Sequence, residues 1–308
     1  MIRALTLAAR TCCCFLVLGV VGACSGNITP EQYQTFANRL LTKGHLRTDR
    51  TPADAPYTNA QLAQNFRKIA FEYEFHFNGG RVVNRPLSKP LNRWDGPIRY
   101  RLVGDAVRPE DKAEVAVLMK EISALTGLET VRAKEDANML ISIATPEGRD
   151  QISAMFGAAG QYVFQSRYDT WRRTPGWICG ATLSVEDYDP HVLVGAHVFL
   201  GSEVTGTLRR ACLHEEIIQS LGLTNDSRAA RPSIFNDDQE FALLTEHDAL
   251  LLRVLYSPHL RPGMKEHEAM PIAEQIIATL RSDGVRSGAR TWAPTGSLSF
   301  GGGAHALD

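Results

Sequence analysis

The residues most able to do chemistry lie in one segment, Cys212–Asp226, which reads Cys-Leu-His-Glu-Glu-Ile-Ile-Gln-Ser-Leu-Gly-Leu-Thr-Asn-Asp. Two side chains four positions apart lie on one face of a helix, so ligands at that spacing can hold a metal ion. A glutamate next to the first ligand can then deprotonate a metal-bound water. A register that begins with His214 fails, because Ile218 would be the second ligand and a hydrocarbon side chain binds no metal.

Moving the register by one residue gives a fuller match. The segment then resembles the metzincin pattern H-E-x-x-H-x-x-G-L-x-H-D, with Glu216, Gly222 and Asp226 at their places in that pattern. In metzincins the glycine turns the chain so that the third ligand approaches the first two. The positions of the three zinc-binding histidines are taken here by Glu215, Gln219 and Asn225.

Two later segments support this resemblance. Pro232–Asn236 resembles the metzincin Met-turn, with Phe235 in the place of the methionine. Leu244–Tyr256 resembles the closing helix of the matrix-metallopeptidase branch. The resemblance implies an α+β fold of the zincin or metzincin type, with a mixed β-sheet, an active-site-type helix and a C-terminal closing helix.

The run from Glu215 to Asp226 is also similar to that of an uncharacterised family of bacterial lipoproteins, the domain-of-unknown-function family number 2927. Membership implies that the glutamate, glutamine and asparagine are a family trait. It implies no established activity.

The ligand set argues against zinc peptidase activity. Zinc favours imidazole and thiolate, whereas Gln219 and Asn225 offer only neutral amide oxygens. We therefore expect no tightly bound cofactor and at most a weak divalent cation at Glu215, Gln219 and Asn225, where Ca²⁺ or Mg²⁺ fits better than zinc. Without a metal, Glu216 has no activated water to deprotonate.

Three functions remain open from the sequence. The first is a degenerate metallopeptidase-like domain that binds an extended peptide or an envelope protein, by strand addition at a sheet edge. The second is a metal-dependent peptidase with a non-standard Glu/Gln/Asn site, with Glu216 as its catalytic base. The third is a structural envelope lipoprotein, in which the acidic residues form a solvated helix face, His214 is a packed or surface residue, and Asp226 braces a turn.

The N-terminus has the features of an export signal. Arg3 and Arg10 precede an apolar stretch that is too short to span a bilayer, which needs roughly 20 residues. The stretch ends in Val-Gly-Ala-Cys24, which resembles the lipobox of bacterial lipoproteins and implies a lipid on Cys24. We expect an envelope protein that faces the periplasm, with the outer membrane favoured because Ser25 follows the cysteine.

We predict four segments: a signal peptide over 1–23, a tether over 24–58, a metzincin-like domain over 59–283, and a disordered Gly/Ser-rich tail over 284–308. Periodicity predicts helices over 59–73, 109–125, 208–221, 245–256 and 271–281, with a short helix near 31–41. It predicts strands over 97–103, 138–144, 177–184 and 192–200, and an irregular segment over 145–175.

Cysteine content and charge complete the analysis. Cys179 and Cys212 remain in the exported chain and are predicted to form a disulfide, with two buried free thiols as the alternative. Lys and Arg total 33 against 34 Asp and Glu, so there is no basic excess to bind nucleic acid.

Overall fold

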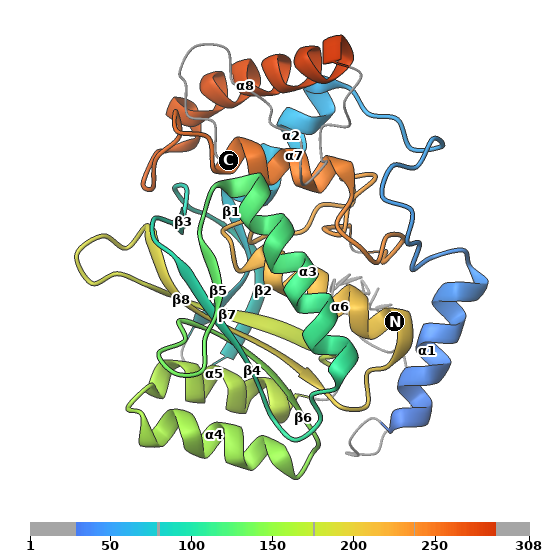
Figure 1. The fold of residues 1–308 in the computed structure, drawn as a ribbon, viewed down its shortest axis with the longest axis vertical. Coiled ribbons are helices and arrows are strands. Elements are labelled where there is room, and N and C mark those ends of the chain that lie inside the picture. Colours follow the sequence, from blue (N-terminus) through green and yellow to red (C-terminus); the bar gives the residue numbers. More distant parts are fainter. Residues whose placement is uncertain (1–28, 79–80, 175, 237, 288–308) are drawn as a thin grey trace, which may run out of the picture.

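The structure, a computed structural model, describes residues 29–287 apart from positions 79–80, 175 and 237. Over these residues the chain is α+β, with eight helices, a six-stranded sheet and a separate two-stranded sheet (Figure 1). The helices are α1 (Pro30–Thr42), α2 (Asn59–Ala70), α3 (Pro109–Thr126), α4 (Gly148–Ala158), α5 (Tyr162–Arg172), α6 (Gly206–Gln219), α7 (Glu246–Leu255) and α8 (Glu266–Ser287). The strands are β1 (Glu72–Asn78), β2 (Arg81–Ser88), β3 (Arg93–Trp94), β4 (Ile98–Val103), β5 (Thr130–Arg132), β6 (Met139–Ala144), β7 (Cys179–Val185) and β8 (Val192–Gly201).

The six-stranded sheet is mostly parallel. Its strand order is β3-β8-β6-β4-β5, and β7 pairs with β8 in the antiparallel direction. The parallel pairing of β6 and β8 places Ile141 opposite Val198. Parallel strands are covered on both faces, which accounts for the almost continuous apolar sequences of β6 and β8. The predicted α+β class is confirmed.

The two faces of this sheet carry separate apolar clusters. Val198 and Leu200 of β8 join the main core, together with side chains from α2, α3, α6, α7 and α8. Phe199 joins a second cluster with Phe156 of α4 and Trp171 of α5. Since successive side chains of a strand point to opposite faces, α6 lies on one face and the α4–α5 pair covers the other (Figure 1).

Elements with strong periodic patterns occur where the sequence predicts them. Helix α3 starts at Pro109 and ends before Gly127, which has a φ of 74° that suits glycine. Helices α2 and α7 begin with capping boxes at Thr58 and Thr245, where the cap side chain accepts a backbone N–H of the first turn.

The segment 145–175, predicted to be irregular, contains α4 and α5. Few side chains of these helices are buried, mainly Ile152 and Phe156 on α4 and Tyr168 and Trp171 on α5. Such a short apolar stripe gives a weak helical period in the sequence, which is why the prediction was wrong.

The β1–β2 hairpin was also missed. The helix predicted over 59–73 ends at Ala70, and the chain enters β1 at Glu72. The sequence Glu-Tyr-Glu-Phe-His-Phe-Asn alternates polar and apolar residues, and this two-residue period favours a strand over a helix.

The described part of the segment predicted as a tether, 29–58, packs against the domain. Helix α1 buries Tyr33, Ala37 and Leu40, and Arg47 forms a parallel β-bridge with Phe241. At the other end, α8 continues to Ser287, beyond the predicted helix end at 281. The segment predicted to be a signal peptide, 1–23, and positions 288–308 of the predicted tail lie outside the described residues.

Replacing Gly222 by alanine should destabilise the protein strongly. Its φ of 114° is strained for other residues, and a Cβ there would collide with the carbonyl oxygen of Asn92. We expect a loss of at least about 2 kcal/mol in the free energy of unfolding, measured by urea denaturation. Gly127→Ala is the control, because Gly127 has a positive φ but open space around it, and it should cost only about 1 kcal/mol. Equal losses in the two variants would contradict the collision.

Candidate functional site

Helix α6 carries the segment that the sequence singles out, and it lies inside the protein. Glu215 and Glu216 are only 9% and 7% exposed. The interpretation of these glutamates as part of a solvated helix face is therefore wrong. A carboxyl group so far from water must be protonated or hydrogen-bonded, because an isolated buried charge is costly.

Glu216 and Asp226 are two acidic side chains that interact electrostatically. Gln219 donates a hydrogen bond from Nε2 to Oδ1 of Asp226 at 3.0 Å. Burial, and secondly the negative charge of Asp226, raises the pKa of Glu216 to about 8. Near neutral pH the pair thus retains a proton, which removes the cost of placing two negative charges together.

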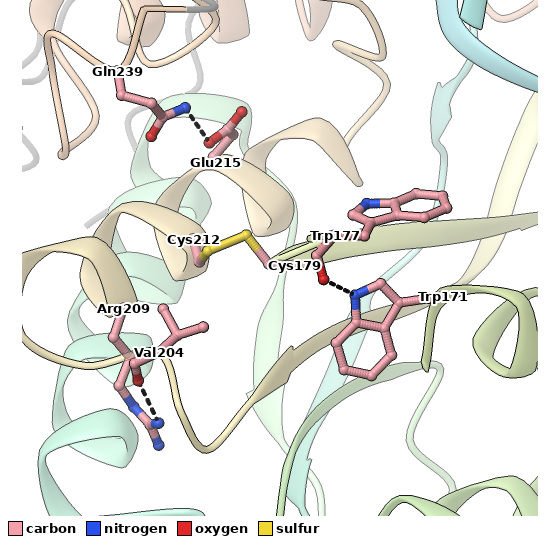
Figure 2. Close-up of a disulfide and its surroundings, with 8 residues drawn as sticks. All are labelled: Trp171, Trp177, Cys179, Val204, Arg209, Cys212, Glu215 and Gln239. Carbon is pink, nitrogen blue, oxygen red and sulfur yellow. Dashed lines mark hydrogen bonds between the residues drawn. A yellow bond between two sulfur atoms is a disulfide. The ribbon is translucent and has the colours of Figure 1, made fainter. Parts of the chain in front are cut away.

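Glu215 is directed to a different partner. Nε2 of Gln239 donates to Oε2 of Glu215 at 3.4 Å, and Gln239 lies in the loop between α6 and α7. Figure 2 shows Glu215 pointing toward Gln239, while Cys212, one turn earlier on α6, points toward β7.

Asn225 is tied to the end of α2. Its Nδ2 donates to the carbonyl of Lys68 at 3.1 Å and to the carboxylate of Glu72 at 3.4 Å. Its backbone N–H donates to the carbonyl of Ile69 at 3.2 Å. Asn225 therefore satisfies carbonyl groups that the end of a helix leaves open.

The turn at Gly222 is held by Lys89, a residue that no sequence motif marks. Nζ of Lys89 donates to the carbonyl of Ala70 at 2.7 Å and to that of Gly222 at 3.5 Å. Burial lowers the pKa of Lys89 to about 7. Lys89 lies between Ser88 and Pro90 without any motif, so no sequence signal could have found it.

These residues do not fit a zinc ion. Each of the three ligand-like positions is held by a different partner, and two of the three are neutral amides. In the part of the chain that the structure describes, no cluster of three or more His, Cys, Asp or Glu side chains could hold a metal ion. Amide oxygens are weak ligands for zinc, so this set of side chains is a poor zinc site.

The segment Pro232–Asn236 forms a turn organised by Asp248 of α7. The Asp248 carboxylate accepts hydrogen bonds from the hydroxyl of Ser233 and the backbone N–H of Ile234. Phe235 is fully buried, and its carbonyl accepts the N–H of Ser227 at 2.8 Å, which joins this turn to the chain after Asp226. Asp248 is the third residue of helix α7 and completes its capping box with Thr245, a signal that the sequence does contain.

His214 joins three parts of the structure. Its Nδ1 accepts the backbone N–H of Leu244 at 3.1 Å, so in the neutral ring Nε2 carries the proton and donates to Glu114 of α3 at 2.8 Å. This hydrogen bond, assisted by Arg210, lowers the pKa of Glu114 to about 2. His214 is a packed residue, as one of the two sequence interpretations had it.

The predicted disulfide is confirmed. Cys179, the first residue of β7, is bonded to Cys212 of α6, with their Cα atoms 6.0 Å apart (Figure 2). Both cysteines are buried, at 7% and 2% exposed. The bond fixes the start of β7 to the helix that carries the glutamates, and it joins two residues that are 33 positions apart in the sequence.

The fold and this helix define an α+β domain in which a buried helix and the turn after it carry acid and amide side chains. A family model described as protein of unknown function (DUF2927) matches residues 59–275, and the chain belongs to that family. No curated protein and no solved structure matches the chain significantly.

Replacing Glu216 by glutamine should remove a pH dependence of stability. A carboxyl group whose pKa rises on folding stabilises fully below its unfolded pKa, near 4.3, and that contribution is lost as the pH rises through the folded value. The wild-type free energy of unfolding should therefore fall relative to Glu216→Gln, by roughly 1 kcal/mol per pH unit, until the pH reaches about 8.

Urea denaturation across this pH range measures the difference between the two curves. Asp226→Asn is the companion variant. It removes the charge that helps to raise the pKa of Glu216, so the fall should still begin near pH 4.3 but end at a lower pH than in wild type. Parallel curves for wild type and Glu216→Gln would show that Glu216 has no raised pKa.

Proposed function

We propose that this protein is a lipid-anchored envelope protein whose metallopeptidase-like domain binds an extended peptide without hydrolysing it. The free edge of β7 carries the proposal. It lies on the strand that the disulfide joins to α6, beside the helix that would carry the metal site in an active metzincin.

The likeness to metzincins gains support from three features of the fold. The sheet is mixed, with one antiparallel strand, and helix α6 follows it with the Glu-Glu-x-x-Gln run. The turn at Pro232–Asn236 precedes a closing helix, α7, and is bonded to it through Asp248. These are the parts that the sequence resemblance implies.

The chemistry of the buried residues favours binding over hydrolysis. With its pKa near 8, Glu216 is mostly protonated at neutral pH and is a poor general base. Two of the ligand-like positions, Gln219 and Asn225, are neutral amides whose oxygens are weak ligands for zinc. A metal-dependent peptidase would need an ionised glutamate as its base and side chains that bind the metal ion strongly.

The edge of β7 has hydrogen-bonding groups that β8 does not use. Leu183 pairs with Ala196, and the N–H of Ala196 donates to the carbonyl of Asn138 on the β6 side. The Leu183–Ala196 pair is therefore a non-hydrogen-bonded pair of the antiparallel ladder, so Leu183 directs its own N–H and carbonyl away from β8. Arg167 of α5 reaches that carbonyl at 3.5 Å.

The same alternation applies two residues earlier along the strand. Ala181 pairs with Val198 and also directs its N–H and carbonyl to the free edge. Among the strands that the structure describes, β7 pairs with β8 alone. An extended peptide can therefore add to β7 through Ala181 and Leu183, as in other peptide-binding sheets.

Ala181→Pro should abolish this binding. Proline removes the N–H donor that faces the edge and leaves the ladder with β8 intact, a position at which edge strands accept proline. Peptides selected from a randomised display library with the wild-type domain should bind the variant at least about tenfold more weakly by calorimetry, the loss expected for one or more hydrogen bonds.

Ala181→Ser is the matched control, because serine keeps the N–H and should bind as wild type does. Thermal unfolding of both variants verifies the fold. If the library yields no binder, or if Ala181→Pro binds as tightly as wild type, the peptide-binding function is wrong and a purely structural envelope protein is favoured.

The proposed anchor rests on the N-terminal sequence. The cysteine of the Val-Gly-Ala-Cys24 run precedes the start of α1 at Pro30 by a few residues. Positions 1–28 lie outside the described residues, and among those described no helix has the length and apolarity to cross a bilayer. Acyl chains on Cys24 would contribute about 0.8 kcal/mol per buried CH₂ group and hold the domain at the periplasmic side of a membrane, with the outer membrane favoured.

Cys24→Ser should prevent lipid attachment. Cells grown with a fatty-acid probe should label the wild-type protein and not the variant, and mass spectrometry should find the N-terminal segment retained in the variant. Cys14→Ser is the control, because that cysteine lies in the segment proposed to be removed. Labelling that persists in Cys24→Ser would contradict the anchor.

A further inference from the structure

The α4–α5 pair contains a surface stretch without charged side chains. Positions 151–166, which run from α4 into α5, include no Asp, Glu, Lys or Arg, although 22% of the whole chain is charged. A stretch of this kind is ordinary in a buried helix. Here, however, ten of the sixteen residues are exposed to solvent, so the lack of charge is a property of the surface.

The exposed apolar side chains gather around the turn that joins the two helices. On α4, Ala154, Met155 and Ala158 form one stripe, directed away from the side of the helix that packs on the sheet. On α5, Tyr162 and Val163 follow the turn directly and are 68% and 61% exposed. We call these five residues the apolar turn.

The apolar turn lies on a pair of helices that also contacts the start of α1. Pro30 and Tyr33 of α1 line one small hollow together with Arg149 at the start of α4 and Arg172 at the end of α5. Figure 1 shows the first residues of α1 and the α4–α5 pair on the lower side of the molecule, with α8 on the opposite side. The chain that precedes α1 therefore reaches the domain beside α4 and α5.

The proposed lipid on Cys24 is near this point along the chain. Six residue steps join Cys24 to Pro30, and an extended chain spans at most about 3.6 Å per residue, so the lipid is within about 20 Å of α1. Helix α4 has 11 residues and is about 16 Å long. A bilayer held at this distance can contact the apolar turn, whereas α8 lies on the far side of the domain.

A bilayer surface suits the side chains of the apolar turn. Tyrosine is enriched at the membrane–water interface, where its ring leaves water and its hydroxyl group stays hydrated. The valine, methionine and alanine side chains can enter the same region without any charge to desolvate. A few side chains insert only weakly, but a lipid anchor keeps the membrane at high effective concentration, so weak insertion is sufficient.

A second copy of the chain is a less suitable cover for this surface. Specific protein interfaces use about 20–30 residues from each partner, which is more than the ten exposed residues of this stretch. A bilayer requires no such minimum area, because binding strength simply increases with the apolar area that enters it.

We propose that the apolar turn inserts into the interfacial layer of the membrane that holds the lipid anchor, to a depth of about 5–10 Å. The proposal rests on the anchor at Cys24. It orients the domain, with α4 and α5 facing the bilayer and α6, on the other face of the sheet, directed away from it. Since the apolar turn is uncharged, its insertion requires no anionic lipid.

The test measures the protection of a fluorophore at Val163. The lipidated protein with Val163→Cys is labelled with nitrobenzoxadiazole and added to preformed phosphatidylcholine vesicles. Quenching by external iodide should be at least about threefold weaker than for the same label at Val117→Cys, because the bilayer covers only the first site. Val117 is the matched position, since it is 69% exposed and lies on α3.

A charge in the apolar turn should remove this protection. Ala158→Glu in the Val163→Cys protein should restore quenching to the level at Val117, because a carboxylate resists insertion. Ala116→Glu on α3 is the control, because Ala116 is also exposed and lies outside the apolar turn. Thermal unfolding verifies the fold of both variants.

A second form of the protein separates this proposal from the anchor itself. The chain from Ser25, with an N-terminal hexahistidine, is bound to vesicles that contain a nickel-chelating lipid, so it needs no lipid on Cys24. Weaker quenching at Val163 than at Val117 supports insertion in this form, whether or not a fatty-acid probe labels Cys24. Equal quenching at the two positions overturns insertion, even where Cys24 is lipidated.

Three further results would also overturn the proposal. Protection of Val117 instead of Val163 would place the α3 face on the membrane. Protection of Val163 only in vesicles that contain phosphatidylglycerol would show that charge, and not the apolar turn, drives the contact. Protection of the hexahistidine form without vesicles, increasing with protein concentration, would identify a second copy of the chain as the cover.

Discussion

The ion pair between Arg209 of α6 and Asp111 of α3 is formed away from water. Nε and Nη2 of Arg209 donate to the two carboxylate oxygens at 2.7 and 2.6 Å, and both side chains are 5% exposed. A buried pair is stable only when its remaining donors are satisfied, and Arg209 meets this condition by donating to the carbonyls of Val204 and Ala106. Helix α6 is thereby fixed inside the protein, and each polar side chain further along it needs an interior partner.

This constraint explains the unusual composition of the rest of the helix. His214 meets it by joining Glu114 to the backbone of Leu244, Glu215 by bonding Gln239, and Glu216 by retaining a proton beside Asp226. A histidine in place of Gln219 could not form the same amide hydrogen bond to Asp226 without a change of geometry. The polar residues of α6 resemble a metal site in the sequence. Their hydrogen bonds to buried partners are enough to explain why polar residues stand at these positions.

The sequence predicted the parts of the fold in which one strong signal dominates. The apolar stripe of α3, the apolar run of β6 and the two cysteines each point to one structure, and each prediction is confirmed. The α4–α5 pair was missed because its buried face is only a few residues wide. In the site, burial decides the protonation of Glu216 and the partner of Asn225, and burial depends on segments distant in the sequence, such as Lys68 of α2. No local pattern encodes these contacts.

Strand β7 is constrained near its start by contacts with helices on both faces of the sheet. The disulfide joins Cys179 to α6 on one face, and two residues earlier the carbonyl of Trp177 accepts the indole N–H of Trp171 on α5, at 2.9 Å (Figure 2). At the other end, the ladder register shifts between Ser184 and Val185, and Tyr188 in the following loop is 96% exposed. A peptide that adds to β7 would therefore meet a fixed start and an open end. Since a pre-organised edge loses less conformational entropy on binding, the residues nearest Cys179 should dominate the affinity of such a peptide.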